Sequence, residues 1–252
     1  MASERRRRLT SLSINKMIPN MLTVLALGAG LTAIRFGLQE RWQAAVVAIV
    51  IAGILDGLDG RIARILGGTS KFGAELDSLS DVISFGVAPA FVLYLWTMNR
   101  GGDPAWVLVL LFPVCCSLRL ARFNTRLGEP DPPWAYNYFT GIPAPAGAGL
   151  VLLPMMLFFI SGAEFLRHPM VNGAMLLIVS GLLVSRIPTY SFKSVRVPYK
   201  YVLPLLLFVG LIAALITSSP WFTLSALILA YIGTFPFSMK SYRTLKRKME
   251  KQ

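Results

Sequence analysis

The sequence predicts an all-α polytopic membrane protein, a bundle of about eight transmembrane helices with both termini in the cytoplasm. Of its 252 residues, 55% are hydrophobic and only 15% are charged, whereas a soluble domain averages about 25% charged residues. The apolar residues gather in runs of about 20, the length needed to cross a bilayer core of about 30 Å. This composition excludes a disordered chain and argues against a water-soluble enzyme.

Eight apolar runs are the candidate membrane helices, and short connections rich in Gly, Pro, Ser or charge separate them. The runs cover residues 20–38, 43–65, 74–98, 105–126, 142–161, 170–187, 201–217 and 221–238. We therefore expect a single transmembrane domain over residues 20–238. A basic juxtamembrane segment (1–19) precedes it, and a basic cytoplasmic tail (239–252) follows it.

The cations lie at alternate ends of these runs. The formal net charge is +13, from 25 Lys and Arg against 12 Asp and Glu. When the basic N-terminal segment is placed in the cytoplasm, the alternation puts most other Lys and Arg there too, as in a multi-pass protein of the cytoplasmic (inner) membrane. The excess positive charge suits anionic lipid headgroups, so we expect membrane lipids rather than nucleic acid as partners.

Four aspartates fall inside two neighbouring predicted helices, where charge is costly and usually marks a functional site. Asp56 and Asp59 are spaced i, i+3, and Asp77 and Asp81 are spaced i, i+4, so each pair shares a helix face. A short connection near 66–72 makes the two helices antiparallel neighbours. At about 1.5 Å per residue the two pairs reach matched depths, and we expect the four carboxylates to converge.

Converging carboxylates need compensating positive charge where the dielectric constant is low. Two divalent cations would supply it, because oxygen ligands suit Mg²⁺ or Mn²⁺ and a pair of such ions about 3.5–4 Å apart serves phosphoryl transfer. Gly60, Ala63 and Gly73 leave room for a ligand beside the acids. Two other interpretations stay open: small residues that only let helices pack closely, and the ion or proton pathway of an ion-coupled transporter.

The spacing of these residues resembles the signature of the CDP-alcohol phosphotransferase family. It reads Asp56-x2-Asp59-Gly60-x2-Ala63-Arg64-x8-Gly73-x3-Asp77-x3-Asp81, without departure from the family pattern. The resemblance implies an enzyme that exchanges the CMP of a CDP-activated alcohol for another alcohol, with residues 20–238 as its catalytic domain and a homodimer as its assembly. It also implies that the four Asp hold two metal ions and that Asp81 is the catalytic proton acceptor.

The resemblance further implies which residues contact the CDP-activated donor. Gly60, Arg64 and Ser70 would touch the CDP group, and the segment from Pro19 to Thr23 resembles the family's nucleotide-side segment. With the space left by two small residues, the predicted donor site consists of Pro19, Asn20, Thr23, Gly60, Ala63, Arg64, Ser70 and Gly73.

Segments beyond the signature resemble one branch of the family, the membrane-integral phosphatidylserine synthases. They are Ser78–Ala90, Leu118–Asn124 and Phe139–Ala146. This branch implies CDP-diacylglycerol as donor, L-serine as acceptor and an active site that faces the cytosol. The synthases of phosphatidylcholine, phosphatidylglycerophosphate and phosphatidylinositol phosphate remain alternatives. No protein nucleophile is evident, because the single histidine, His168, is expected on the outer side, so we expect direct displacement.

Two arginines favour serine as the acceptor, since serine carries a carboxylate and choline does not. Arg119 and Arg122 are spaced i, i+3 near the cytoplasmic end of the fourth predicted helix, and Asn124 follows. A guanidinium binds a carboxylate through two parallel hydrogen bonds, which makes these three residues the predicted serine site. Both arginines could instead be positive-inside anchors. A choline site would call for an aromatic cage, and aromatic residues are nearby: Tyr136, Tyr138 and Phe139.

Overall fold

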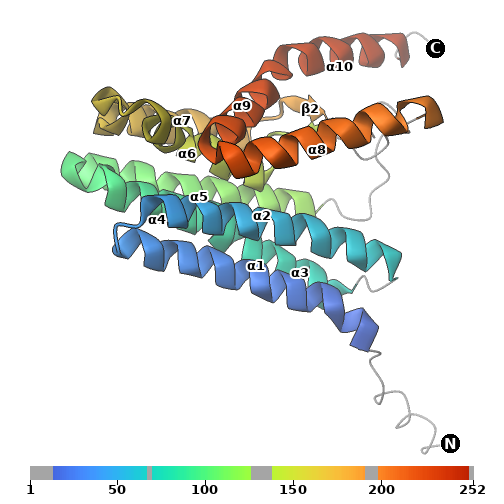
Figure 1. The fold of residues 1–252 in the computed structure, drawn as a ribbon, viewed down its shortest axis with the longest axis horizontal. Coiled ribbons are helices and arrows are strands. Elements are labelled where there is room, and N and C mark those ends of the chain that lie inside the picture. The colour runs from blue at the N-terminus through green and yellow to red at the C-terminus, as the bar shows by residue number, and fades with distance from the viewer. Residues whose placement is uncertain (1–13, 67–69, 126–137, 191–197, 250–252) are drawn as a thin grey trace, which may run out of the picture.

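The structure, a computed structural model, describes residues 14–66, 70–125, 138–190 and 198–249 (Figure 1). Its elements in chain order are α1 (Ile14–Leu38), α2 (Trp42–Ile65), α3 (Lys71–Asp81), the π-helix η2 (Val82–Val87), α4 (Ala88–Trp96), the 3₁₀-helix η3 (Met98–Gly101), α5 (Gly102–Asn124), β1 (Tyr138–Thr140), α6 (Ala144–Ser161), the 3₁₀-helix η4 (Glu164–Arg167), α7 (Pro169–Val184), β2 (Pro188–Tyr190), the 3₁₀-helix η6 (Tyr199–Tyr201), α8 (Val202–Ser218), α9 (Pro220–Gly233) and α10 (Phe235–Met249).

Long apolar helices make up most of the described chain. Five stretches are long and apolar enough to cross a membrane: Met17–Leu38, Lys71–Trp96, Met98–Asn124, Ala144–Ser161 and Pro220–Tyr242. α7 and α8 are shorter apolar helices, and α2 is a helix of 24 residues that packs along α1. The prediction of a helical polytopic membrane protein is confirmed.

The helix ends differ from the predicted ones mainly at the two termini. α1 begins at Ile14 rather than at residue 20, so Pro19 is inside the helix, and residues 1–13 lie outside the described part. The predicted helix 221–238 is two helices that meet at Thr234, and α10 continues to Met249 within the predicted tail. The start of α1, the junction of α2 with α3 and the end of α10 lie toward the same end of the molecule (Figure 1).

α3, η2 and α4 form one continuous helix whose middle is π-helical, and the π-helical turn begins directly after Asp81. Within it, the Ser84 hydroxyl donates a hydrogen bond to the carbonyl of Ala26 on α1 (3.3 Å). α1 comes this close because Gly30 faces the same hydroxyl, and a Cβ on Gly30 would lie 2.5 Å from it. The first helix is therefore held tightly against the helix that carries two of the four acids.

A two-stranded antiparallel sheet links distant parts of the chain, because β1 pairs with β2. Gly141, just after β1, has a φ of 78°, and a Cβ there would lie 2.9 Å from the Leu183 carbonyl oxygen, so the position requires glycine. Its N–H donates to the carbonyl of Ile187 (2.8 Å). On the other side of the sheet, the Ser238 hydroxyl of α10 donates to the carbonyl of Pro188 (2.8 Å). The sheet thus ties the start of α6 to α10.

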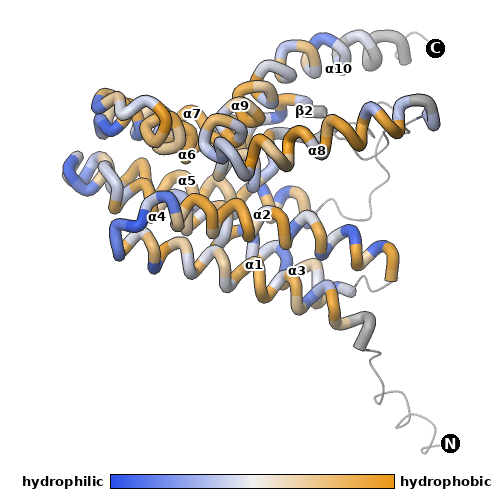
Figure 2. The backbone as a smooth tube through the Cα atoms, in the orientation of Figure 1, coloured by the Kyte–Doolittle hydropathy of each residue, from blue (hydrophilic) through white to orange (hydrophobic). Residues whose placement is uncertain are grey.

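The buried core lies among α2, η2, α4, α5, α6 and α7, and its largest fully buried side chains include Phe85, Trp96, Phe112, Met155 and Leu176. α6 contributes the largest number of buried residues among these helices, ten of its 18. α8 is equally apolar in sequence, yet none of its 17 residues is buried. Figure 2 shows apolar residues over the outward-facing helices as well, as expected for surfaces that face lipid.

Candidate active site

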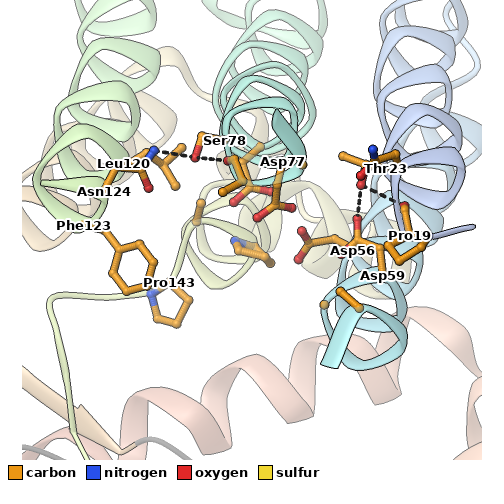
Figure 3. Close-up of a pocket in the computed structure, with 18 of the residues that line it drawn as sticks. Pro19, Thr23, Asp56, Asp59, Asp77, Ser78, Leu120, Phe123, Asn124 and Pro143 are labelled. Carbon is orange, nitrogen blue, oxygen red and sulfur yellow. Dashed lines mark hydrogen bonds between the residues drawn. The ribbon is translucent and has the colours of Figure 1, made fainter. Parts of the chain in front are cut away.

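All four aspartates of α2 and α3 line one cavity of about 480 Å³. Asp56 and Asp59 reach it from the C-terminal part of α2, and Asp77 and Asp81 reach it from α3. Because the connection between α2 and α3 is short, the two helices run antiparallel and present their acids to the same space. In Figure 3 the carboxylates of Asp56 and Asp77 point toward each other.

The carboxylates lie close enough together to share a cation. One oxygen each from Asp56, Asp59 and Asp77 lies within 4.8 Å of the other two. Asp56 is also within hydrogen-bonding reach of both Asp77 and Asp81, so it is the acid that links the two helices. Two carboxylates at such a distance require a shared proton or a cation between them.

Asp59 is held from α1 as well as from its own helix. It is 5% exposed, and the Thr23 hydroxyl lies 2.6 Å from its Oδ2 and 3.1 Å from the carbonyl of Pro19 (Figure 3). The Ser80 hydroxyl of α3 in turn donates to the carbonyl of Thr23 (3.3 Å). α1, α2 and α3 are thus joined by polar contacts at the depth of the acids.

The predicted donor residues all line the same cavity: Pro19, Asn20, Thr23, Gly60, Ala63, Arg64, Ser70 and Gly73. The Ser70 hydroxyl accepts the N–H of Gly73 (3.0 Å) and so caps the start of α3. A Cβ on Gly73 would lie 2.8 Å from Oδ1 of Asn20, whereas a Cβ on Gly60 would meet no atom within 4 Å. The absence of a side chain at Gly73 therefore lets α1 approach α3, whereas the absence of one at Gly60 leaves open space in the cavity.

The predicted serine residues separate into two groups. Arg119 and Asn124 line the cavity, and Nδ2 of Asn124 donates to the Ser78 hydroxyl (2.8 Å). Arg122 does not line it. Its guanidinium donates to the carbonyls of Val184 (2.8 Å) and Ser185 (3.1 Å), where α7 ends. Carbonyls at a helix C-terminus lack partners within the helix, so Arg122 supports the end of α7.

Several lining residues do not belong to the predicted metal, donor or serine sites: Ala74, Ser78, Leu120, Phe123, Pro143, Ala144 and Pro145. Those on α3 and α5 are helix neighbours of predicted residues and could have been found from helical spacing. Pro143 to Pro145 close the cavity from the start of α6. For that segment the sequence allows two interpretations, a lining of the acceptor side or a bent, tightly packed helix. Tyr136 and the side chains of Tyr138 and Phe139 lie outside the described residues.

The chemistry of the lining residues fits divalent cations. Four aspartates and two arginines, Arg64 and Arg119, are the charged residues of the cavity lining, so the cavity is net negative when its acids are ionised. Clustered carboxylate oxygens are the ligands that Mg²⁺ and Mn²⁺ prefer. The acids are therefore a candidate metal site.

The family model for CDP-alcohol phosphatidyltransferases matches residues 16–184, and a second model, CDP-alcohol phosphatidyltransferase 2, matches residues 200–236. The chain belongs to the CDP-alcohol phosphatidyltransferase family. The match to residues 16–184 spans the whole cavity lining, from Pro19 to Pro145. The resemblance read from the spacing of the acids is confirmed.

Curated relatives of this CDP-alcohol phosphatidyltransferase carry the name CDP-diacylglycerol–serine O-phosphatidyltransferase. The protein of Mycobacterium leprae is 42% identical over 96% of this chain and 79% of its own length. That of Mycobacterium tuberculosis is 42% identical over 93% of this chain and 82% of its own length. That of Helicobacter pylori strain 26695 is 36% identical over 78% of this chain and 81% of its own length.

Proposed function

We propose that this protein transfers the phosphatidyl group of CDP-diacylglycerol to the hydroxyl of L-serine and releases CMP. The observation that carries the proposal is the single cavity in which four carboxylates from α2 and α3 lie opposite Arg119 of α5. The 42% identity to relatives with that name supports it over most of the chain.

The donor's CDP group would occupy the side of the cavity formed by α1, α2 and the start of α3. Gly60 leaves open space there, and Arg64 lines it with a guanidinium that suits a phosphate. The part of α2 that precedes Asp56 is mostly apolar. The acyl chains can therefore stay in the bilayer while the polar headgroup enters the cavity.

The four aspartates would hold two divalent cations, Mg²⁺ or Mn²⁺. When bound, such ions neutralise the pyrophosphate and stabilise the charge that develops on the departing CMP. Thr23 contributes by orienting Asp59. Asp56 contributes by its closeness to both aspartates of α3.

In the reaction itself, Asp81 accepts the proton of the serine hydroxyl. The hydroxyl oxygen forms a bond to the phosphorus that bears diacylglycerol, and the bond from that phosphorus to the CMP oxygen breaks. We propose a single in-line displacement, which inverts a chiral phosphorus. Retention of configuration would mean two displacements and would overturn this step.

The acceptor side would be formed by α5 and the start of α6. The carboxylate of serine pairs with Arg119, and Asn124 lies on the same side of the cavity. Arg122 is given no role with the acceptor, because its guanidinium already binds the end of α7.

A single assay tests the proposal against its alternatives. Membranes that contain the protein are given CDP-diacylglycerol, Mn²⁺ or Mg²⁺, and one acceptor at a time: serine, choline, glycerol phosphate or inositol phosphate. We expect CMP to be released when serine is the acceptor, together with formation of phosphatidylserine, and not with the other three acceptors. Release with another acceptor would assign another branch of the family, and no release with any of them would favour an ion-coupled transporter.

We further propose that the cavity faces the cytosol of a cell with the protein in its inner membrane, and that the protein forms homodimers. The Ser70→Cys variant carries a thiol at the rim of the cavity, and this thiol should react with a membrane-impermeant maleimide only in inside-out vesicles. Cys115 and Cys116 are buried and give little background. Cross-linking in native membranes tests the dimer.

A further inference from the structure

One nitrogen of the Arg119 guanidinium, Nε, is a buried hydrogen-bond donor without an acceptor among the described residues. The same side chain lines the cavity and interacts electrostatically with Asp81. A buried donor without a partner destabilises the protein, so a partner is expected in some state of the protein.

A second unsatisfied group lies on a helix outside the cavity lining. The hydroxyl of Tyr231 on α9 is buried and makes no hydrogen bond of normal geometry within the described ranges. Its ring packs edge-on against Phe235, with centroids 5.1 Å apart. Tyr231 and Arg119 lie close enough to interact electrostatically. Two buried polar atoms, on α5 and α9, therefore lie within electrostatic range of each other, and neither makes a hydrogen bond of normal geometry with the described residues.

The orientation of the Tyr231 hydroxyl follows from Thr189 of β2, which also interacts with it. Thr189 is 1% exposed, and its own hydroxyl donates to the carbonyl of Gly141 (2.8 Å). The Thr189 oxygen can then only accept from Tyr231. When the phenol proton points at Thr189, the lone pairs of the Tyr231 oxygen are left for a donor such as the Nε–H of Arg119.

We propose that Tyr231 is a positioning residue that sets Arg119 for the acceptor's carboxylate. When the outer nitrogens of the guanidinium bind the carboxylate, the Nε–H donates to the Tyr231 hydroxyl, and this contact fixes the plane of the guanidinium. The inference rests on the proposed function and adds to it. It places part of the acceptor selectivity in α9, which lies outside the stretch 16–184 that contains the whole cavity lining.

A purely structural role would not need the hydroxyl. The aromatic contact with Phe235 uses only the ring, and phenylalanine would make the same contact without burying a polar atom. The orientation of a bidentate guanidinium, by contrast, depends on what its third nitrogen binds.

The test is Tyr231→Phe in the full-length protein, assayed for CMP release in membranes. We expect the KM for serine to rise about 10-fold, the equivalent of about 1.4 kcal/mol, while the KM for CDP-diacylglycerol stays the same and kcat changes less than about twofold. Tyr199→Phe is the matched control, because Tyr199 is 93% exposed, and it should change none of these values.

Two further measurements separate positioning from packing. Serinol is serine with its carboxylate replaced by an alcohol, and Tyr231→Phe should leave its kcat/KM unchanged. Arg119→Lys removes the Nε–H, so adding Tyr231→Phe to it should raise the serine KM by less than about twofold more. Equal losses with serinol, additive effects in this double-mutant cycle, or an unchanged KM for serine would each overturn the role of Tyr231.

The acceptor used by the unsubstituted protein distinguishes failure of the positioning role from failure of the proposed function. If it releases CMP with serine and Tyr231→Phe leaves the serine KM unchanged, only the positioning role fails. If it releases CMP with choline and not with serine, the proposed function fails, and the positioning role fails with it because choline has no carboxylate.

Discussion

α6 and α8 are apolar helices of nearly equal length, and the structure uses them in opposite ways. α6 has ten buried residues, and its start closes the cavity opposite the acids. α8 has no buried residue and packs mainly against α9 and η6. In a bilayer an apolar side chain gains little by leaving lipid for protein. Hydrophobicity therefore places both helices in the membrane without deciding which of them joins the core.

Polar contacts between helices distinguish the two regions better. Around the cavity, the hydroxyls of Thr23, Ser80 and Ser84 each form a hydrogen bond to a helix other than their own. On α8, the hydroxyl of Thr217 bonds to carbonyls of its own helix. The helices around the cavity are therefore fixed relative to one another by specific contacts, and substitutions there should cost far more than substitutions on α8.

The largest effect is expected at Asp56, because it is close to both aspartates of α3. Asp56→Asn should lower the rate of CMP release by about 10³-fold at any concentration of Mg²⁺ or Mn²⁺. Asp103→Asn is the control, since Asp103 is exposed in the first turn of α5, far along the helix from the cavity. More than a tenth of normal activity in Asp56→Asn would contradict a central role for the acids.

Arg119 and Arg122 should respond differently although they are three residues apart on one helix. Arg119→Ala should raise the KM for serine about 100-fold, from the loss of charge-assisted hydrogen bonds to the carboxylate. Arg122→Ala should keep the KM for serine and lower stability by about 1.5–3 kcal/mol, because the carbonyls of Val184 and Ser185 lose their donor. Activity at varied serine concentration measures the first effect, and thermal unfolding in detergent measures the second. A raised KM for serine in Arg122→Ala, with an unchanged KM in Arg119→Ala, would show that Arg122 and not Arg119 binds the acceptor.

Matched substitutions at Gly60 and Gly210 allow a direct comparison of the cavity with α8, because a Cβ at either position would meet no atom within 4 Å. Gly60→Leu should raise the KM for CDP-diacylglycerol about 10-fold, since the new side chain occupies space that the donor needs. Gly210→Leu adds a side chain on the face of α8 exposed outside the protein and should leave the KM for the donor unchanged. Equal effects would mean that the opening at Gly60 is not part of the donor site.

The smallest effect is expected on α8 itself. Leu207→Ala should change stability by less than about 0.5 kcal/mol, because Leu207 is 68% exposed. Leu153→Ala on α6 is the matched substitution at a side chain that is 4% exposed, and it should cost about 2–5 kcal/mol. A large loss for Leu207→Ala in native membranes, and none in dilute detergent, would show that a second protein chain covers α8.

The sequence predicted what depends on spacing within a helix. Asp56, Asp59, Asp77 and Asp81 could be assigned to one site because two helical periods and one short connection determine where the side chains meet. Arg122 could not be assigned, because its partners are the last carbonyls of α7, 62 and 63 residues away. Whether Arg122 faces a ligand or a helix end depends on where α7 stops in space.

The other unpredicted features also depend on contacts between distant residues. β1 and β2 are each only three residues long, too short for an alternating pattern to show. Tyr231 is an ordinary aromatic residue of an apolar helix in the sequence, and its significance comes only from its neighbours Arg119 and Thr189. The π-helical turn after Asp81 has no composition that separates it from the helix on either side.

That turn determines where the chain length can change over evolution. Six residues, Val82–Val87, wind more widely than the helices they join. A π-helical turn closes with one more residue than an α-helical turn, so deleting one of them would restore regular winding with little rotation of α4 relative to Asp81. Deleting one residue from α3 after Asp77, or from α4 before Leu93, would instead rotate the two ends of the helix by about 100° relative to each other. Either a carboxylate would then turn away from the other three, or Leu93 and Trp96 would turn out of the interior. A one-residue deletion is therefore tolerated best within Val82–Val87.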